Sequence, residues 1–299
     1  MALPKGHLWD VVKALLDRAG YNISVKGERS YRVESRDQDL ELRIHRAQNI
    51  SLLVEQGRYD LGITGLDWIL EPQADVVELT DLKVGRVYVV AATPERYGLD
   101  ESLGLEVFSR FQERIRQDKK ERIVVASEYE NLTRSLFETR MPSMAYRFIR
   151  SYGATETFIE VADLIVDCTE TGATLRENGW AIIHRLFEST ARLIANKTSL
   201  EDPWKREKLD GLLSLIEGAR DAKGLRLLKM NVPEDCMSKV MSILPAMKSP
   251  TVSKLYGDDG SGYAVEVAVE EAQIVQLIPK LKRAGAADIL ELQIEKVVR

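Results

Sequence analysis

The chain has 299 residues, of which 44% are hydrophobic and 30% are charged. This composition is typical of a globular protein and excludes a disordered chain, and the length is sufficient for two or three domains. The formal net charge is −5 and no dense basic block is present, which argues against a surface for nucleic acid.

Cysteine use and the N-terminus predict a cytoplasmic protein. Cys168 and Cys236 lie far apart and form neither a disulfide framework nor a CxxC pair. Because no long apolar segment follows a basic start, we expect neither a signal peptide nor a membrane anchor. The three histidines lack metal-ligand spacing, which argues against a histidine-based metal site.

Helix and strand patterns alternate up to about residue 222. Apolar residues recur at helical spacing from Leu8 to Ala19, and Gly20 ends the pattern. Further helices are predicted at 50–55, 131–139 and 199–222, and strands at 40–44, 60–64, 84–92, 122–126, 164–166 and 181–183. This alternation predicts βα units with largely parallel sheets. Crossings near 84 and 178 predict one lobe of residues 1–84 and 178–222 and a second lobe of residues 85–177.

The pattern changes after residue 224. Strands are predicted at 225–230, 251–256, 263–269 and 289–294, and the turn-rich link 257–260 indicates a hairpin. One helix is predicted to open at Pro233, and a second to bend or break at Pro279. The order βαββαβ predicts a ferredoxin-like domain over residues 223–299.

Residues 171–175, Thr-Gly-Ala-Thr-Leu, lie between a short apolar strand and a predicted helix. Gly172 allows a tight turn, and successive backbone amides before a helix form an anion site. Thr171 and Thr174 add hydroxyl donors, and Asp167 could accept ribose hydroxyls. A plain strand-to-helix turn with threonine caps explains the same residues, and it is the more frequent outcome for an isolated motif.

Three other segments could contact a ligand. Lys5-Gly6 precedes a helix and could hold an anion, or could be a turn with a solvated lysine. The segment 62–65 could be a loop on which a ligand rests, or a tight turn followed by a helix-start carboxylate at Asp67. Asn131 could cap a helix while Arg134 faces a phosphate, although a capped surface helix explains both equally well.

Together these segments resemble the ATP phosphoribosyltransferase family of histidine biosynthesis, in its long form. The resemblance covers nearly the whole chain in order and rests on 3–6 (Leu-Pro-Lys-Gly), 46–50, 57–65, 131–134, 162–163, 171–175, 178–179, 250–252 and 285–286. It implies an α/β fold, with a two-lobed core like that of periplasmic binding proteins and a C-terminal ACT-like regulatory domain of ferredoxin-like type.

The resemblance also implies the reaction, in which N1 of the ATP adenine attacks C1 of phosphoribosyl pyrophosphate and pyrophosphate leaves. Mg²⁺ would be carried by the pyrophosphate oxygens rather than by side chains. Such a reaction needs oriented reactants and stabilised charge more than a covalent intermediate. This requirement agrees with the lack of a Ser-His-Asp or Cys-His set in the sequence.

By resemblance, three groups of residues bind small molecules. Phosphoribosyl pyrophosphate is expected at Asp167, Thr169, Thr171, Gly172, Ala173, Thr174 and Leu175. The ATP side of the cleft is expected at Lys5, Gly6, Arg46, Gly62, Thr64, Gly65 and Arg134. Histidine, as feedback inhibitor, is expected at Asn231, Ser249, Thr251 and Asp288. The family further implies a homo-oligomer, a hexamer in equilibrium with dimers.

The chain departs from the family pattern at four places. His7 replaces an arginine, Glu128-Tyr129-Glu130 replaces Lys-Tyr-Pro, Asn49-Ile50-Ser51 replaces Asp-Ile-Pro, and Glu160 replaces a glycine. Two alternatives to the transferase therefore stay open. One is a non-catalytic histidine or nucleotide sensor on the same fold, and the other is a phosphoribosyltransferase that acts on another base.

Overall fold

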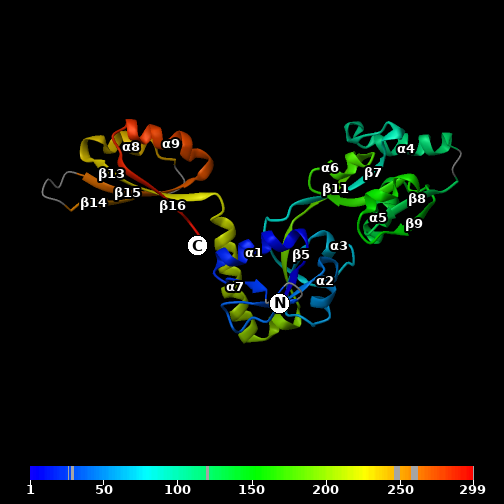
Figure 1. Ribbon diagram of the computed structural model, residues 1–299, viewed down its shortest axis with the longest axis horizontal. Helices are drawn as coiled ribbons and strands as arrows, with labels where there is room; N and C mark the ends of the chain where they lie inside the picture. The colour runs from blue at the N-terminus through cyan, green and yellow to red at the C-terminus, as the bar shows by residue number, and fades with distance from the viewer. Residues whose placement is uncertain (26, 28–29, 119–120, 246–249, 257–261, 299) are drawn as a thin grey trace. The chain divides into compact units, whose positions relative to one another are not determined.

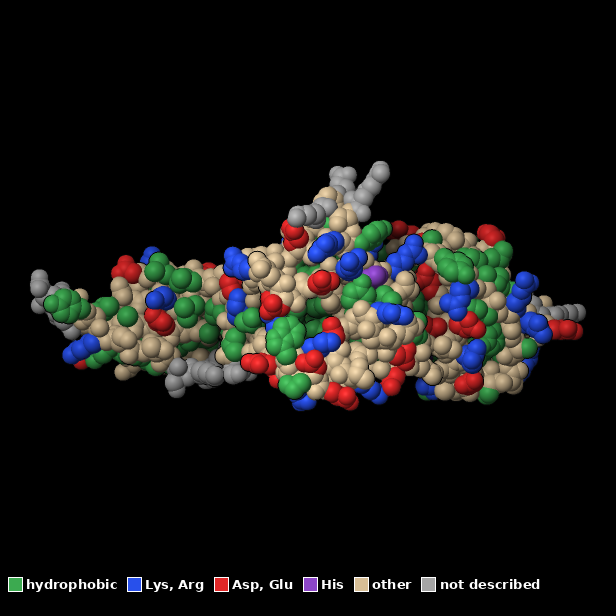
Figure 2. Space-filling model, turned by 90° about the horizontal axis from the view of Figure 1, so that it is seen from below, with side chains coloured by type: hydrophobic (Ala, Val, Ile, Leu, Met, Phe, Trp, Pro, Cys, Tyr) green, Lys and Arg blue, Asp and Glu red, His purple; other side chains and the backbone are tan. Residues whose placement is uncertain are grey.

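The computed structural model describes the chain except residues 26, 28–29, 119–120, 246–249, 257–261 and 299. The chain divides into two compact units, an N-terminal unit of Met1–Asp17 with Tyr21–Asp210 and a C-terminal unit of Arg18–Gly20 with Gly211–Arg299. Among the described residues, no helix has the length and apolar character needed to cross a membrane. Positive and negative side chains are interspersed on the face drawn in Figure 2.

The first sheet of the N-terminal unit has seven strands in the order β2-β3-β4-β1-β5-β12-β6. These are β1 (Ala2–Pro4), β2 (Ser24–Val25), β3 (Arg32–Glu34), β4 (Leu42–His45), β5 (Leu61–Gly65), β6 (Val77–Asp81) and β12 (Ala191–Ala195), and its helices are α1 (His7–Ala19), α2 (Ala47–Glu55) and α3 (Asp67–Leu70). The predicted first helix is confirmed, because Leu8, Val12 and Leu16 are buried and Gly20 follows with a φ of +102°.

The second sheet has five strands in the order β11-β7-β10-β8-β9. These are β7 (Val87–Pro94), β8 (Ile123–Ser127), β9 (Tyr146–Arg150), β10 (Leu164–Thr169) and β11 (Trp180–Ser189), with helices α4 (Glu106–Gln117), α5 (Glu130–Arg140) and α6 (Ala173–Glu177). Successive residues of β10 enter different cores, since Leu164 and Val166 join one cluster and Ile165 joins another. This sheet is therefore buried on both faces, as an uninterrupted apolar strand requires.

The two sheets are mixed, and the prediction of largely parallel sheets is wrong. Strand β1 is parallel to β4 and β5, and β8 is parallel to β9 and β10, but β7 runs antiparallel to both β10 and β11. Strand β12 is likewise antiparallel to β5 and β6. The physical reason is the double crossing, because the chain enters the second sheet along β7 and leaves it along β11 (Figure 1).

The crossing confirms the predicted two-lobed α/β core. Strand β11 pairs within the second sheet as far as Ser189, and β12 pairs within the first sheet from Ala191 onward. The change of sheet therefore falls after the predicted boundary at 178. The exact lobe and domain boundaries stay predictions.

The C-terminal unit follows helix α7 (Pro203–Asp221), whose last turns belong to it. Its sheet has the order β14-β15-β13-β16, and every neighbouring pair is antiparallel. The elements are β13 (Leu225–Pro233), α8 (Met237–Ile243), β14 (Thr251–Lys254), β15 (Gly262–Glu270), α9 (Glu271–Arg283) and β16 (Ala287–Gln293). Both helices cover one face of the sheet (Figure 1), so the predicted ferredoxin-like domain is confirmed.

Of the two predictions about prolines in this unit, the helix start at Pro233 is wrong, and helix α9 is not broken at Pro279. Pro233 is the last residue of β13, and the helix begins only at Met237, after a 3-10 turn over Glu234–Cys236. Helix α9 continues through Pro279. Residue Val275, one turn earlier, is 82% exposed, so its carbonyl can be hydrated where the proline offers no amide. The predicted hairpin turn at 257–260 lies outside the described residues.

Candidate functional site

The carboxyl ends of the parallel strands β1 and β4 bring Lys5 and Arg46 to one edge of the first sheet. Leu3 and Pro4 pair with Ile44 and His45, and the Lys5 amide donates to the His45 carbonyl at 2.7 Å. Lys5 and Arg46 are both exposed, at the starts of α1 and α2. Ligands of α/β sheets bind outside the carboxyl ends of parallel strands, so this edge is suited to an anionic ligand.

The turn before α1 is open to a ligand. Gly6 has a φ of +84°, and a Cβ at that position would meet no atom within 4 Å. The Lys5 Nζ lies 5.1 Å from the centre of the Tyr31 ring, a cation–π contact that leaves the ammonium exposed. His7, where the family has an arginine, is exposed as the first residue of α1.

The segment 62–65 is a buried strand rather than the loop considered from the sequence. Every residue of β5 is buried, and the Thr64 hydroxyl donates to the Ala47 carbonyl at 2.9 Å. A Cβ at Gly62 would lie 2.6 Å from Ile50 Cγ2. Gly62 therefore leaves room for α2 to pack on the sheet, and the Thr64 side chain is used in the interior rather than in a ligand loop. A Cβ at Gly65 would lie 2.2 Å from the Asp67 carboxylate.

The loop between β10 and α6 (residues 169–175) has the turn that the sequence predicts. Gly172 has a φ of +77° and its amide donates to the Thr169 hydroxyl at 2.9 Å. The Ala173 amide donates to the Thr171 hydroxyl at 3.3 Å. The side chains of Thr171, Ala173 and Thr174 are exposed. The threonine hydroxyls thus hold the loop in shape and lie at its surface, within reach of a bound anion.

Leu175 takes part in this loop only through its backbone. Its side chain is 3% exposed and belongs to the apolar cluster that contains Trp180 and Ile165. In the predicted phosphoribosyl pyrophosphate site, the Leu175 side chain therefore serves to fix the first turn of α6 to the sheet.

Asp167 lies one strand residue before Cys168 and carries an unusual protonation equilibrium. Burial raises the pKa of Asp167 to about 7, and the charges of Glu156 and Glu128 act in the same direction. The Cys168 amide donates to the Asp167 carboxylate at 2.8 Å and opposes the shift. Near neutral pH the carboxyl group can therefore both donate and accept hydrogen bonds, as recognition of ribose hydroxyls requires.

Cys168 is not set up as a nucleophile. Burial raises the pKa of its thiol to about 12, and the Asp167 charge adds to the effect. Because the thiolate is the reactive form, the thiol at this position is inert at neutral pH. Both cysteines of the chain are free.

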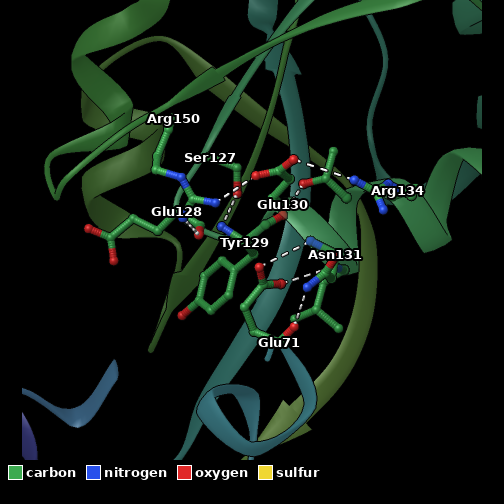
Figure 3. A network of polar contacts seen from close by, with 10 residues as sticks. Glu71, Ser127, Glu128, Tyr129, Glu130, Asn131, Arg134 and Arg150 are labelled. Atoms are coloured by element: carbon green, nitrogen blue, oxygen red, sulfur yellow. Dashed lines mark hydrogen bonds and ion pairs between the residues drawn. The ribbon is translucent and has the colours of Figure 1, made fainter. Parts of the chain in front are cut away.

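The start of α5 is capped from a distant part of the chain, and the prediction that Asn131 is the N-cap is wrong. The cap position is Tyr129, which makes no side-chain cap. The Glu71 carboxylate accepts instead from the amides of Asn131 and Leu132, at 3.0 Å each (Figure 3). The Asn131 side chain donates back to the Glu71 carbonyl at 2.7 Å. Sequence reasoning missed Glu71, because nothing in its surroundings indicates a partner sixty residues later.

Arg134 is exposed, but its guanidinium is paired with a carboxylate. Glu130 binds it at 3.4 Å and binds Arg150, from β9, at 2.6 Å (Figure 3). Nearby, the Glu128 carboxylate accepts from the Gln48 side chain of α2 at 3.2 Å. The two glutamates that depart from the family pattern therefore have partners, and the Gln48 contact brings the start of α2 next to the start of α5.

In the C-terminal unit, two of the predicted histidine-binding residues lie together. The side-chain amide of Asn231 donates to the Asp288 carboxylate at 2.9 Å. Thr251 pairs with Glu266 on the far side of β15, and both Thr251 and Asn231 point away from the core that contains Met230 and Val265. Ser249 lies outside the described residues.

A search of the described residues for metal ligands finds no group of three or more His, Cys, Asp or Glu side chains that could hold an ion.

Comparison with known proteins matches almost the entire chain. The family model ATP phosphoribosyltransferase matches residues 46–218, and the model HisG, C-terminal domain matches residues 222–296. ATP phosphoribosyltransferase from Prosthecochloris aestuarii is 40% identical over 304 residues, which cover 100% of this chain and 97% of the relative. The enzyme of that name from Pelotomaculum thermopropionicum is 40% identical over 299 residues, covering 100% and 98%.

A solved structure shares the fold over most of the chain. It is the ATP phosphoribosyl transferase (HisG:HisZ) complex from Thermotoga maritima, with a TM-score of 0.56 and 26% identity. The match covers 72% of this chain and 97% of that one.

Proposed function

Because the chain belongs to the ATP phosphoribosyltransferase family, we propose that it performs that family's transfer at the two sites described above, with phosphoribosyl pyrophosphate at the loop 169–175 and ATP at the edge formed by Lys5 and Arg46. The reaction is the first step of histidine biosynthesis and yields phosphoribosyl-ATP and pyrophosphate. The full-length similarity to enzymes of this name does not favour a non-catalytic sensor.

The observation that carries the proposed phosphate site is the shape of the loop. Gly172 adopts a left-handed conformation that a residue with a Cβ rarely takes, and the loop exposes Thr171 and Thr174. Hydroxyls and backbone amides around such a turn bind the oxygens of a phosphate. The 5′-phosphate of phosphoribosyl pyrophosphate is the group that we assign to it.

Asp167 and Thr169 would hold the ribose of the same substrate. Asp167 lies two residues before Thr169, the last residue of β10, so the two side chains lie on the same face of the strand where it leads into the phosphate loop. A carboxyl group with a pKa of about 7 can accept from a ribose hydroxyl when it is ionised. Protonation would turn one carboxyl oxygen into a donor and leave a weaker, neutral acceptor.

Transfer itself requires no covalent intermediate. The adenine nitrogen is a nucleophile already present on the substrate, and the departing pyrophosphate concentrates negative charge. Mg²⁺ would enter on the pyrophosphate oxygens as part of the substrate, and Lys5 and Arg46 would add fixed positive charge. Alignment of the two reactants can contribute about 7–11 kcal/mol to lowering the barrier.

On the ATP side, the residues divide into two kinds. Lys5, Gly6 and Arg46 would contact the nucleotide directly, since they are exposed at the strand ends. Gly62, Thr64 and Gly65 would support that edge from within the sheet. Arg134 would reach a triphosphate only by leaving Glu130.

The C-terminal unit is our candidate for feedback control by histidine. Asn231 and Asp288 offer an amide and a carboxylate, which suit an amino acid's polar groups, and Thr251 and Ser249 complete the proposed set. A homo-oligomer, hexameric or dimeric, is part of the same proposal. The solved relative is named as a complex, which supports assembly as a property of such chains. Two free thiols fit a cytoplasmic location.

The test of the activity is direct. The purified chain is mixed with ATP, phosphoribosyl pyrophosphate and Mg²⁺, and phosphoribosyl-ATP is measured by its absorbance and by mass. Product is expected in amounts equal to the pyrophosphate released. Folded protein that gives no product at any histidine concentration would contradict the proposal.

Feedback control has a separate test. Histidine is titrated calorimetrically into the wild type and into the Asp288→Ala variant, and each protein is assayed with and without histidine. We expect the variant to keep its activity and to lose both histidine binding and inhibition. Equal inhibition of the two proteins would refute the assignment of Asp288 without affecting the transferase.

A further inference from the structure

The short helix α3 presents two carboxylates to the second lobe. Asp67 is the first residue of α3 and Glu71 is its C-cap residue with helical backbone angles, so the two side chains, four residues apart, lie on the same side; they are 4% and 7% exposed. Both meet the segment 127–132, which joins β8 to α5. The contact connects an element of the first sheet to an element of the second without passing through the crossing strands.

Glu71 forms the first of the two connections. Its two carboxylate oxygens accept from the Asn131 and Leu132 amides, at 3.0 Å each (Figure 3). These amides belong to the first turn of α5, where no carbonyl of the helix can reach them and where a negative charge is favoured. Since hydrogen bonds to a charged acceptor are stronger than neutral ones, this connection resists stretching.

Asp67 forms the second connection. One carboxylate oxygen accepts from the Tyr129 hydroxyl at 2.8 Å, and the other accepts from the Ser189 hydroxyl at 2.6 Å. Ser189 is the last residue of β11, so Asp67 also fixes the returning strand where it re-enters the first sheet. Between the two connections, the Trp68 and Tyr129 rings stack with centroids 4.6 Å apart.

The same segment is tied to the strand that carries the phosphate loop. The Ser127 hydroxyl donates to the Val166 carbonyl of β10, and the Tyr129 amide donates to the Ser127 hydroxyl at 2.8 Å. Val166 directly precedes Asp167 in β10. An unbroken series of contacts therefore runs from α3, through residues 127–132, to the strand that leads into the loop 169–175.

We propose that Glu71, together with Asp67, is a positioning residue for phosphoribosyl transfer, which holds the phosphoribosyl pyrophosphate loop at the correct distance from the ATP edge of the first lobe. Neither carboxylate needs to touch a substrate. The inference rests on the proposed placement of the two substrates on different lobes. Because the reacting atoms must be aligned closely, a small change in lobe placement lowers the rate far more than the affinity.

The kinetic test compares Glu71→Ala with a matched control, Glu55→Ala. Glu55 also accepts from a backbone amide, that of Asp75 at 2.9 Å, but both partners lie in the first lobe. We expect Glu71→Ala to lower kcat about tenfold or more and to leave the KM for phosphoribosyl pyrophosphate within about threefold, because the loop's own contacts are local. Glu71→Gln, which keeps an acceptor oxygen, should recover most of the lost kcat.

Three kinetic outcomes would overturn the proposal. The first is a kcat for Glu71→Ala within about twofold of wild type. The second is an equal loss in Glu55→Ala, which would indicate general destabilisation. The third is a rise in KM with unchanged kcat, which would make Glu71 a binding residue. If Glu71→Ala does not fold, Tyr129→Phe is tested in its place, because this change removes the hydrogen bond to Asp67 and keeps the aromatic ring. An unchanged kcat in Tyr129→Phe would also overturn the proposal.

A spectroscopic test is independent of turnover. In a Trp9→Phe, Trp204→Phe background, emission comes from Trp68 and from Trp180, which is fully buried in the second lobe. We expect Glu71→Ala to shift the emission to longer wavelength while the far-ultraviolet circular dichroism is unchanged, and Glu55→Ala to cause no shift. Identical spectra of Glu71→Ala and wild type would refute the connection between the lobes. If the wild-type protein showed no transferase activity but Glu71→Ala still shifted the emission, the connection would stand and the proposed function would be refuted.

Discussion

Two segments of this chain both combine glycine with threonine and use them in opposite ways. The segment 171–174, Thr-Gly-Ala-Thr, follows an apolar strand pattern, and the segment 62–65, Gly-Ile-Thr-Gly, overlaps one. The first is an exposed turn in which Gly172 has a positive φ. The second is a fully buried strand in which Gly62 leaves room for a helix.

The difference shows that glycine and threonine mark two distinct physical needs. In the loop, glycine supplies a conformation and threonine supplies surface hydroxyls. In the strand, glycine supplies the absence of a side chain, and the Thr64 hydroxyl satisfies the Ala47 carbonyl in the interior. Substitutions in the loop should therefore affect substrate, and substitutions in the strand should affect stability.

The largest expected effect is that of Gly172→Ala. The new Cβ would be strained at a φ of +77° and would lie 2.9 Å from Ile182 Cδ1, which displaces the loop. We expect kcat/KM for phosphoribosyl pyrophosphate to fall about 100-fold, from loss of aligned phosphate contacts. Steady-state kinetics measure the effect.

Gly98→Ala is the matched control for Gly172→Ala. Gly98 has a similar φ of +65° and nothing within 4 Å of its Cβ position, and it lies at the end of a 3-10 turn. It should show the cost of backbone strain, about 1–2 kcal/mol, without a change in kcat/KM. A comparable kinetic loss in both variants would mean that the loop has no special role.

Gly62→Ala should act in the opposite way. A Cβ there would lie 2.6 Å from Ile50 and 2.8 Å from Val54, so α2 must move outward. Overpacking of this kind costs about 1–3 kcal/mol, which urea unfolding would detect. The KM for phosphoribosyl pyrophosphate should stay near wild type, because the loop 169–175 belongs to the other sheet. Gly211→Ala, in α7 with nothing within 4 Å, is the control and should be neutral or stabilising. A loss of ATP affinity with unchanged stability would restore the loop interpretation.

The predictable parts of the fold are those decided by short-range patterns. The helix from Leu8 to Ala19 and the βαββαβ domain follow from periodicity and from glycine positions, and the structure has both. The direction of β7 and β11 does not, because it depends on the chain crossing twice between the sheets. Pro279 shows the same limit, since exposure decides whether a helix tolerates it.

In the candidate site, contacts between residues close in sequence could be predicted, and contacts between distant segments could not. The hydroxyl-to-amide contacts of Thr169 and Thr171 span two or three residues, and a motif can indicate them. The cap on α5 comes from Glu71, and the packing of α2 on the sheet depends on the missing side chain at Gly62. Both require knowledge of which elements pack together, and no local pattern in the sequence supplies it.

A third prediction concerns pH and Asp167. The folded-state pKa is raised from 3.8 to about 7, so between about pH 4 and pH 7 the folded chain keeps a proton that the unfolded chain has lost. This group therefore makes stability fall as pH rises through that window, by about 1–2 kcal/mol after allowance for its partial exposure. In Asp167→Asn the fall should be smaller. Urea unfolding at pH 5 and pH 8 measures both, and parallel profiles would contradict the prediction.

Asp100→Asn is the control for that pH dependence. Hydrogen bonds from Ser102 lower the pKa of Asp100, which is the opposite sign. The contribution of Asp100 to the stability of the folded chain is complete above about pH 4 and is lost only as the pH falls below that value. Between pH 5 and pH 8 this variant should follow the wild-type profile, so that any flattening in Asp167→Asn belongs to Asp167.

The smallest expected effects distinguish the two threonines. Thr174→Ala removes one exposed hydroxyl and should raise the KM for phosphoribosyl pyrophosphate about three- to tenfold with unchanged unfolding, since one hydrogen bond to a charged group contributes about 1.5 kcal/mol or somewhat less where water competes. Thr64→Val keeps the shape of a buried side chain but removes the bond to the Ala47 carbonyl, so it should cost about 1 kcal/mol of stability and leave KM unchanged. Kinetics and urea unfolding of both variants form the test. If Thr64→Val changed KM and Thr174→Ala changed only stability, the strand would be the ligand site and the loop a structural turn.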